Sequence, residues 1–324
     1  MNQRPAGEIT TVMSDDNHEK IPLPDRFAGC LLGLAVGDAL GAPVEGLPRG
    51  SFAPVRDMIG SPQRGLAPGE WTDDTALALA LGHSLVLRQG FDPSDQMERY
   101  CRWLEEGHLR CADSRLFVGR TTHEALLRFR ATGNPFCGSD SLETATNGCI
   151  MRLAPVAMFY FRDVQQAEFY AAESARTTHA FAACTDAARL LARMLVRALS
   201  GASRDTILLA DAGYFHGVPG IMLLAEGAYL HKTPGEIRGS SNVVESLEAA
   251  LWCFATTRSF EEAIVCAVNL GDDADTTAAV CGQIAGAYYG CQAIPSRWVS
   301  VLAKREAICQ LAQELLHAAL ARPT

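Results

Sequence analysis

The chain has 324 residues, of which 48% are hydrophobic and 20% charged, and its formal net charge is −9. This composition excludes a wholly disordered chain, because the apolar fraction is large enough to form a buried core. The negative charge argues against general nucleic-acid binding, which needs a basic face, and no stretch approaches the ~20 apolar residues of a membrane span.

The predicted elements after a polar N-terminal segment are helices. Residues 1–25 contain prolines and no apolar period, so we expect a mobile arm. Clean two-residue alternation over strand length is missing, and no linker interrupts the rest. We therefore predict one compact all-α domain over residues 26–322. Helices are expected from about Phe27, after the Asp73–Asp74 pair, and over residues 187–199, 243–254, 259–268, 273–289 and 305–321.

Two acidic clusters stand at the predicted starts of helices almost two hundred residues apart, Trp71–Thr75 and Gly271–Thr277. A single cluster is explained by the helix dipole, which favours carboxylates in the first turn. Two clusters suggest more, because Asp and Thr oxygens are the hard ligands that Mg²⁺ and Mn²⁺ prefer. Carboxylates packed together without cations would also repel one another. We infer a two-metal site supplied by both clusters.

Three further segments carry polar residues beside apolar helices. Glu45 lies on a Gly/Pro loop, where its carboxylate faces either solvent or a cleft. His179 follows two threonines and is either a structural histidine or a ligand for phosphate or ribose. Asn147–Arg152 reads as a turn followed by an apolar helix that contains one arginine.

The 11 cysteines do not indicate disulfides or zinc. Their number is odd and no C-x-x-C pair occurs, and many lie among apolar residues like small buried hydrophobes. The first 25 residues lack the basic end and apolar run of a signal peptide. The sequence therefore predicts a cytoplasmic protein with reduced thiols, with neither nucleic acid nor membrane as a partner.

Taken together and in order, six segments resemble the ADP-ribosylglycohydrolase family. The resemblance extends from about Arg26 to Trp298. The segments are GCLLGLAVGDALGAPVEG, WTDDTALALA, NGCIMRLAPVA, the TTH triplet, NVVESLEAALW and NLGDDADTTAAVCGQIAGAYYG.

This resemblance implies an orthogonal all-α fold whose cleft holds two Mg²⁺ or Mn²⁺ ions. The implied metal ligands are Thr72, Asp73, Asp74, Asp273, Asp275 and Thr276. The implied catalytic residues are Glu45, Asp74 and Asp273, and the implied substrate-binding residues are Asn147, Gly148, His179, Gly119 and Thr121.

The chain departs from the family pattern at three positions. Asp272 stands where glycine is common, so we leave it out of the ligand set. Phe117 stands where an aspartate often lies near the scissile group, which leaves the acceptor specificity open. Asn242 replaces a usual aromatic residue, which we expect to change how the distal ribose or the adenine is held.

The expected activity is metal-dependent removal of ADP-ribose from modified protein side chains, above all arginine, with release of free ADP-ribose. One alternative is hydrolysis of another linkage, such as ADP-ribosyl-serine, an ADP-ribose polymer or O-acetyl-ADP-ribose. A second alternative is a binding or inhibitor protein that blocks an ADP-ribosyltransferase with its N-terminal arm. A structural helical protein with acidic helix starts is the simplest alternative, and the matched site residues argue against it.

Overall fold

The computed structural model describes residues 21–111, 118–209 and 211–322. Most of the predicted arm and Phe117 therefore lie outside the described residues. Helix α1 (Leu23–Gly41) includes the last three residues assigned to the arm. Pro24 suits this place, because a proline in the first helical turn removes an N–H that has no intrahelical partner.

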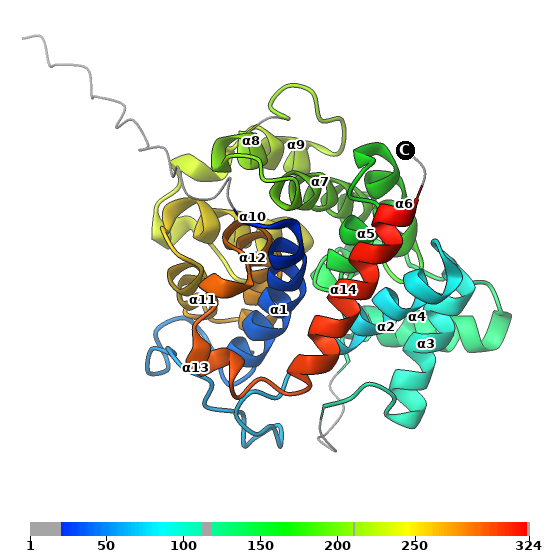
Figure 1. Cartoon of the computed structure of the whole chain (residues 1–324), viewed down its shortest axis with the longest axis horizontal. Helices are drawn as coiled ribbons and strands as arrows, with labels where there is room; N and C mark the ends of the chain where they lie inside the picture. Colours follow the sequence, from blue (N-terminus) through cyan, green and yellow to red (C-terminus); the bar gives the residue numbers. More distant parts are fainter. Residues whose placement is uncertain (1–20, 112–117, 210, 323–324) are drawn as a thin grey trace, which may run out of the picture.

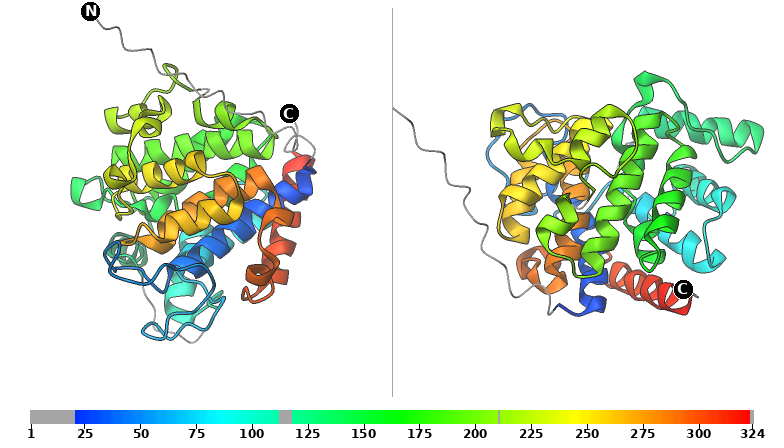
Figure 2. Two further views of the ribbon diagram at one scale, coloured as in Figure 1. Left: turned by 90° about the vertical axis from the view of Figure 1, so that its left-hand side faces the viewer. Right: turned by 90° about the horizontal axis from the view of Figure 1, so that it is seen from above.

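The centre of the fold is the helix pair formed by α1 and α12 (Ala274–Tyr289), which run side by side in Figures 1 and 2. Glycine occurs at every fourth position of α1, from residue 29 to residue 41. A Cβ atom at Gly33 would lie 2.2 Å from the carbonyl oxygen of Gly282, and one at Gly37 would lie 2.1 Å from that of Ala278. The two backbones are therefore in direct contact, which only glycine permits.

The other helices surround this pair (Figure 1). The described residues contain isolated β-bridges but no strand, which confirms the all-α prediction. None of these helices is long and apolar enough to cross a membrane. The helices around the central pair are α2 (Asp73–Arg88), α3 (Pro93–Glu106), α4 (Arg120–Thr132), α5 (Ala154–Phe159), α6 (Val164–Arg176), α7 (Ala182–Leu199), α8 (Arg204–Leu209), α9 (Pro219–Ala225), α10 (Val243–Thr256), α11 (Phe260–Val268), α13 (Ser296–Val299) and α14 (Arg305–Ala321).

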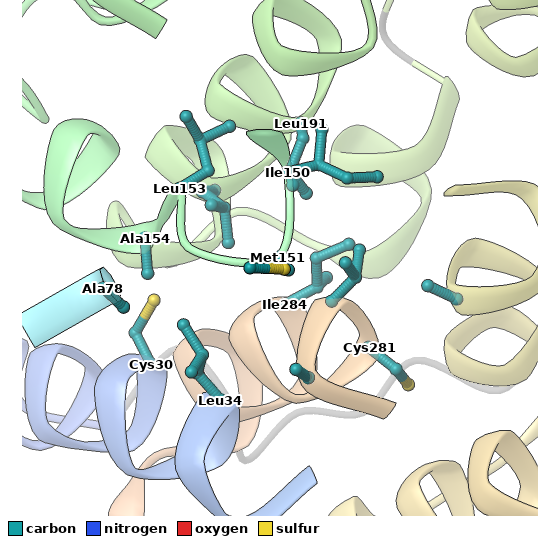
Figure 3. Packing of buried hydrophobic residues seen from close by; sticks show 14 of the residues in the cluster. Cys30, Leu34, Ala78, Ile150, Met151, Leu153, Ala154, Leu191, Cys281 and Ile284 are labelled. Atoms are coloured by element: carbon teal, nitrogen blue, oxygen red, sulfur yellow. The ribbon is translucent and has the colours of Figure 1, made fainter. Parts of the chain in front are cut away.

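The hydrophobic core includes side chains from most of the helices, and one part of it lies between the central pair and the segment before α5. Figure 3 shows Met151 and Leu153 of this segment close to Leu34 of α1 and Ile284 of α12. All of these side chains are buried. This packing holds the segment that follows Asn147 against α1 and against α12, the helix that Asp273 immediately precedes.

Two local predictions can be compared directly with the helix boundaries. Both acidic clusters lie at helix N-termini, as predicted, because α2 begins at Asp73 and Asp273 immediately precedes α12. The placement of Arg152 inside a helix was wrong, since α5 begins two residues later. Pro155 explains this start, because it fits the first turn of a helix but not its interior.

Candidate metal centre and substrate cleft

A cleft of about 740 Å³ lies where the N-terminal ends of α2, α4 and α12 meet. Most of the residues that line it carry carboxylate, hydroxyl or amide groups. The lining residues are Glu45, Gly46, Asp73, Asp74, Gly119, Arg120, Thr121, Thr122, Glu143, Thr146, Asn147, Gly148, Met151, His179, Ser240, Ser241, Asp272, Asp273, Asp275 and Thr276.

Three buried carboxylates from three helices form the inner part of this site. Asp38 of α1, Asp74 of α2 and Asp275 of α12 each offer an oxygen, and these oxygens lie within 4.8 Å of one another. The Oδ1 atom of Asp74 is buried and has no hydrogen-bond partner among the described residues. An unpaired buried carboxylate oxygen is costly, so the group fits a hard divalent cation that would supply the missing partner.

Asp38 was missed as a site residue by the sequence analysis. Its carboxylate accepts hydrogen bonds from the backbone N–H and hydroxyl of Thr72, with donor–acceptor distances of 2.9 and 2.8 Å. It also accepts from the N–H and hydroxyl of Thr75, at 3.0 and 2.6 Å. Asp38 therefore anchors the start of α2 to α1. An aspartate between two glycines of an apolar helix was the available signal, because a buried carboxylate must have polar partners.

A second carboxylate group lies nearer the opening of the cleft. Glu45, Asp273 and Asp275 offer oxygens within 4.8 Å of one another. Glu45 also forms an ion pair with Arg64. The Nδ2 atom of Asn147 donates to Oδ2 of Asp273 at 2.8 Å, which orients that carboxylate.

The loop that carries Glu45 is attached to the start of α12 through its backbone. The N–H of Gly46 donates to the carbonyl of Asp272 at 2.6 Å, and the N–H of Asp272 donates to the carbonyl of Leu47 at 2.8 Å. This pairing places the Glu45 carboxylate beside the second acidic cluster.

Burial makes the ionised form of these carboxylates costly. Burial, followed by the negative charges of Glu45 and Asp38, raises the pKa of Asp73 to about 7. Burial also raises the pKa values of Asp74 and Asp275 well above their ordinary range, again with neighbouring carboxylates as the next cause. Cations would relieve this repulsion, so the carboxylates present fit a metal site.

The other predicted ligands lie at the same place, with differences in their contacts. Thr276 and Asp73 line the cleft, although Asp73 belongs to neither close carboxylate group. The Thr72 hydroxyl lies within hydrogen-bond distance of Oδ1 of Asp38 and, at 3.3 Å, of Oδ2 of Asp74. Thr72 is not among the residues that line the cleft. Asp272 lines the cleft but is exposed.

All of the predicted substrate-binding residues line the cleft. Gly119 and Thr121 come from the start of α4, and Asn147 and Gly148 from the 3-10 turn Asn147–Cys149. His179 is buried, and burial together with the nearby Arg152 charge lowers its pKa well below the ordinary histidine value. The imidazole is therefore neutral.

Asn242 occupies the position of the usual aromatic residue but does not line the cleft. Its side chain accepts hydrogen bonds from the N–H groups of Val244 and Glu245, at 3.0 and 3.3 Å. It is thus the N-cap of α10. Its neighbours Ser240 and Ser241 supply the cleft wall at this point.

The geometry defines a helical protein with a carboxylate cleft suited to hard cations, and comparisons with known proteins place it in a family. The ADP-ribosylglycohydrolase family model matches residues 19–323. The ADP-ribosylarginine hydrolase Tri1 of Serratia proteamaculans is 37% identical over 297 residues, covering 91% of this chain and 80% of the relative. The ADP-ribosyl-dinitrogen reductase glycohydrolase of Rhodospirillum rubrum is 34% identical over 291 residues, covering 86% and 90%.

A solved structure titled "ADP-ribosylglycohydrolase-related protein complex" has the same fold. It superposes with a TM-score of 0.81 at 44% identity, covering 92% of this chain and 99% of that one. The chain therefore belongs to the ADP-ribosylglycohydrolase family. The class of activity that goes with this family is hydrolysis of an ADP-ribosyl linkage.

Proposed function

We propose that the protein is a metal-dependent hydrolase that removes ADP-ribose from modified arginine side chains and releases free ADP-ribose. The observation that carries this proposal is the meeting of the two acidic helix starts in one cleft, with the Asp38 carboxylate close to Asp74 and Asp275. Arginine is the preferred linkage because the similar Tri1 protein is named an ADP-ribosylarginine hydrolase. The cysteine content supports action in the cytoplasm.

We assign two divalent cations, Mg²⁺ or Mn²⁺, to the two overlapping carboxylate groups. Asp38, Asp74 and Asp275 would hold one ion, and Glu45, Asp273 and Asp275 the other. The hydroxyls of Thr72 and Thr276 and the carboxylate of Asp73 complete the proposed ligand set. Bound ions supply Lewis acidity and a template that orients substrate oxygens.

Side chains of the protein provide proton transfer and stabilise the charge that develops on the substrate. A carboxylate, that of Glu45, Asp74 or Asp273, takes the proton of the water that attacks the anomeric carbon. Positive charge develops on the ribose in this step, as in other glycosyl cleavages, and the surrounding carboxylates stabilise it.

The start of α4 suits the pyrophosphate. Its first turn lines the cleft through Gly119, Arg120 and Thr121. The N–H groups at the start of a helix have no intrahelical partner and favour anions. Arg120 adds a positive charge at the same end.

A panel of defined substrates tests the proposed linkage. The purified protein is incubated with protein substrates ADP-ribosylated on arginine or on serine and with O-acetyl-ADP-ribose, each with Mg²⁺, and free ADP-ribose is measured by chromatography. We expect the fastest release from the arginine substrate. Preferred hydrolysis of the serine or acetyl linkage would contradict the arginine assignment and direct attention to Phe117.

A further inference from the structure

A buried arginine lies behind the cleft without a carboxylate partner among the described residues. Arg152 is 1% exposed. Its Nη2 atom donates to the hydroxyl of Thr178 at 2.6 Å, and its guanidinium carbon lies 4.7 Å from the ring centre of Tyr100. Within the described ranges, its Nε and Nη1 atoms have no hydrogen-bond partner. A buried cation of this kind is costly, which calls for a role beyond packing.

The bond to Thr178 leads on to His179. The Thr178 hydroxyl lies 2.7 Å from Nδ1 of His179. Arginine can only donate, so the threonine oxygen accepts from Arg152. Thr178 is fully buried, and Nδ1 is the one acceptor found for its proton in the described part of the chain. The threonine therefore donates to Nδ1.

This direction determines the tautomer of the imidazole. Since Nδ1 accepts and the ring is neutral, the ring proton is on Nε2. Nε2 lies 2.9 Å from the hydroxyl oxygen of Thr146, which accepts it. The Thr146 hydroxyl in turn donates to that of Thr121 at 3.2 Å.

The series ends at the cleft wall. Thr121 lines the cleft and already accepts from Thr146, so its own single proton remains for an acceptor inside the cleft. Gly148 keeps the series compact, because a Cβ atom there would lie 2.9 Å from Cε1 of His179. The result is an oriented row of five polar side chains from the core to the cleft.

We propose that Arg152 is a positioning residue that acts through Thr178 to hold His179 in its Nε2–H tautomer, so that the Thr121 hydroxyl donates into the cleft. The group in the cleft that accepts the Thr121 proton is an oxygen atom. This last step rests on the proposed function: we infer that the acceptor is an oxygen of the ADP-ribosyl group.

The tautomer is measured by NMR on full-length protein labelled with ¹⁵N-histidine, without ligand. Long-range proton–nitrogen correlations of the ring distinguish the two tautomers, and the His179→Gln variant identifies the signal. We expect pure Nε2–H in the wild type and a tautomer mixture in Arg152→Met and Thr178→Val. Arg152→Lys and Thr178→Ser keep the donor and the hydroxyl, so these matched controls should retain the wild-type pattern.

Binding of ADP-ribose in the presence of Mg²⁺ is measured by calorimetry on the same proteins. We expect the dissociation constant to rise about tenfold in Arg152→Met and in Thr121→Val, as for the loss of one hydrogen bond to a charged ligand. Thr121→Val should leave the His179 tautomer unchanged, because it lies at the far end of the series.

Any one of three results would overturn the inference: an Nδ1–H tautomer in the wild type, pure Nε2–H in Arg152→Met, or pure Nε2–H in Thr178→Val. If Arg152→Met does not fold, Thr178→Val decides alone, because it breaks the series while Arg152 remains. Failure of the wild type to bind ADP-ribose would contradict the proposed function instead, and the tautomer would still decide the role of Arg152.

Discussion

Asp275 belongs to both carboxylate groups of the cleft, so it is the residue on which the metal site depends most. We expect Asp275→Asn to lower Mg²⁺ affinity and to reduce ADP-ribose release about a hundredfold or more, because an amide cannot replace the charge. Circular dichroism should show an unchanged helical content. The matched control is Asp205→Asn, at an exposed aspartate outside the cleft lining, which should retain wild-type activity. Wild-type turnover by Asp275→Asn would contradict the proposal of two metal ions.

Asp73 makes the stability of the metal-free folded protein depend on pH in a direction that can be stated. Its pKa is raised from 3.8 to about 7 by burial and then by Glu45 and Asp38. A group whose pKa is higher in the folded state stabilises the protein at low pH, and this contribution is lost as the pH rises from about 4 to about 7.

The test compares the wild type with Asp73→Asn in EDTA. The melting temperature of the wild type should fall relative to that of the variant as the pH rises through this window, because the amide does not ionise. Added Mg²⁺ should stabilise the wild type more at pH 7 than at pH 5, since metal ligands must be deprotonated. Parallel stability curves for the two proteins would contradict the burial of an ionising Asp73.

At the scale of single residues, the sequence located most of the candidate site. Carboxylates and threonines at helix starts are local patterns, so Asp73, Asp273 and Thr276 could be named from their neighbours. Asp38 could not, because its partners Thr72 and Thr75 are brought to it only by helix packing.

Among the elements, the contact of α1 with α12 determines where the carboxylates meet. A Cβ atom at Gly33 would lie 2.2 Å from the Gly282 carbonyl oxygen, so Gly33→Ala must separate the backbones. We expect a loss of about 1–3 kcal/mol of unfolding free energy, measured by urea denaturation, and weaker Mg²⁺ binding as Asp38 moves away from Asp275.

The control for this variant is Gly235→Ala. Nothing lies within 4 Å of a Cβ atom at Gly235, so its unfolding free energy should stay within about 0.5 kcal/mol of wild type. Equal urea midpoints for Gly33→Ala and Gly235→Ala would show that the close helix contact is not needed for stability.

Helix positions were predictable to the extent that their signals are local. The Ser259 side chain accepts from the N–H of Glu262 and caps α11, as its position before two glutamates indicated. The contact between α1 and α12 joins residues about 240 positions apart. Its glycine spacing is visible in the sequence, but the partner helix is identified only by the three-dimensional structure.

For the whole molecule, one cleft combines what the sequence presented as separate segments. The acidic helix starts, the Asn147–Gly148 turn, His179 and the start of α4 all line it. Family membership explains why these segments occur together, and the structure adds the side chains that orient them, notably Asp38 and the series from Arg152 to Thr121.

The most direct test of metal-dependent hydrolysis is the rate of ADP-ribose release from arginine-ADP-ribosylated protein after metal removal. The wild-type protein is treated with EDTA, divided, and assayed with and without added Mg²⁺ or Mn²⁺. We predict that release stops in EDTA and returns when either ion is restored, because the cleft carboxylates repel one another and cannot orient the substrate without cations. Undiminished release from metal-free protein would contradict the proposal.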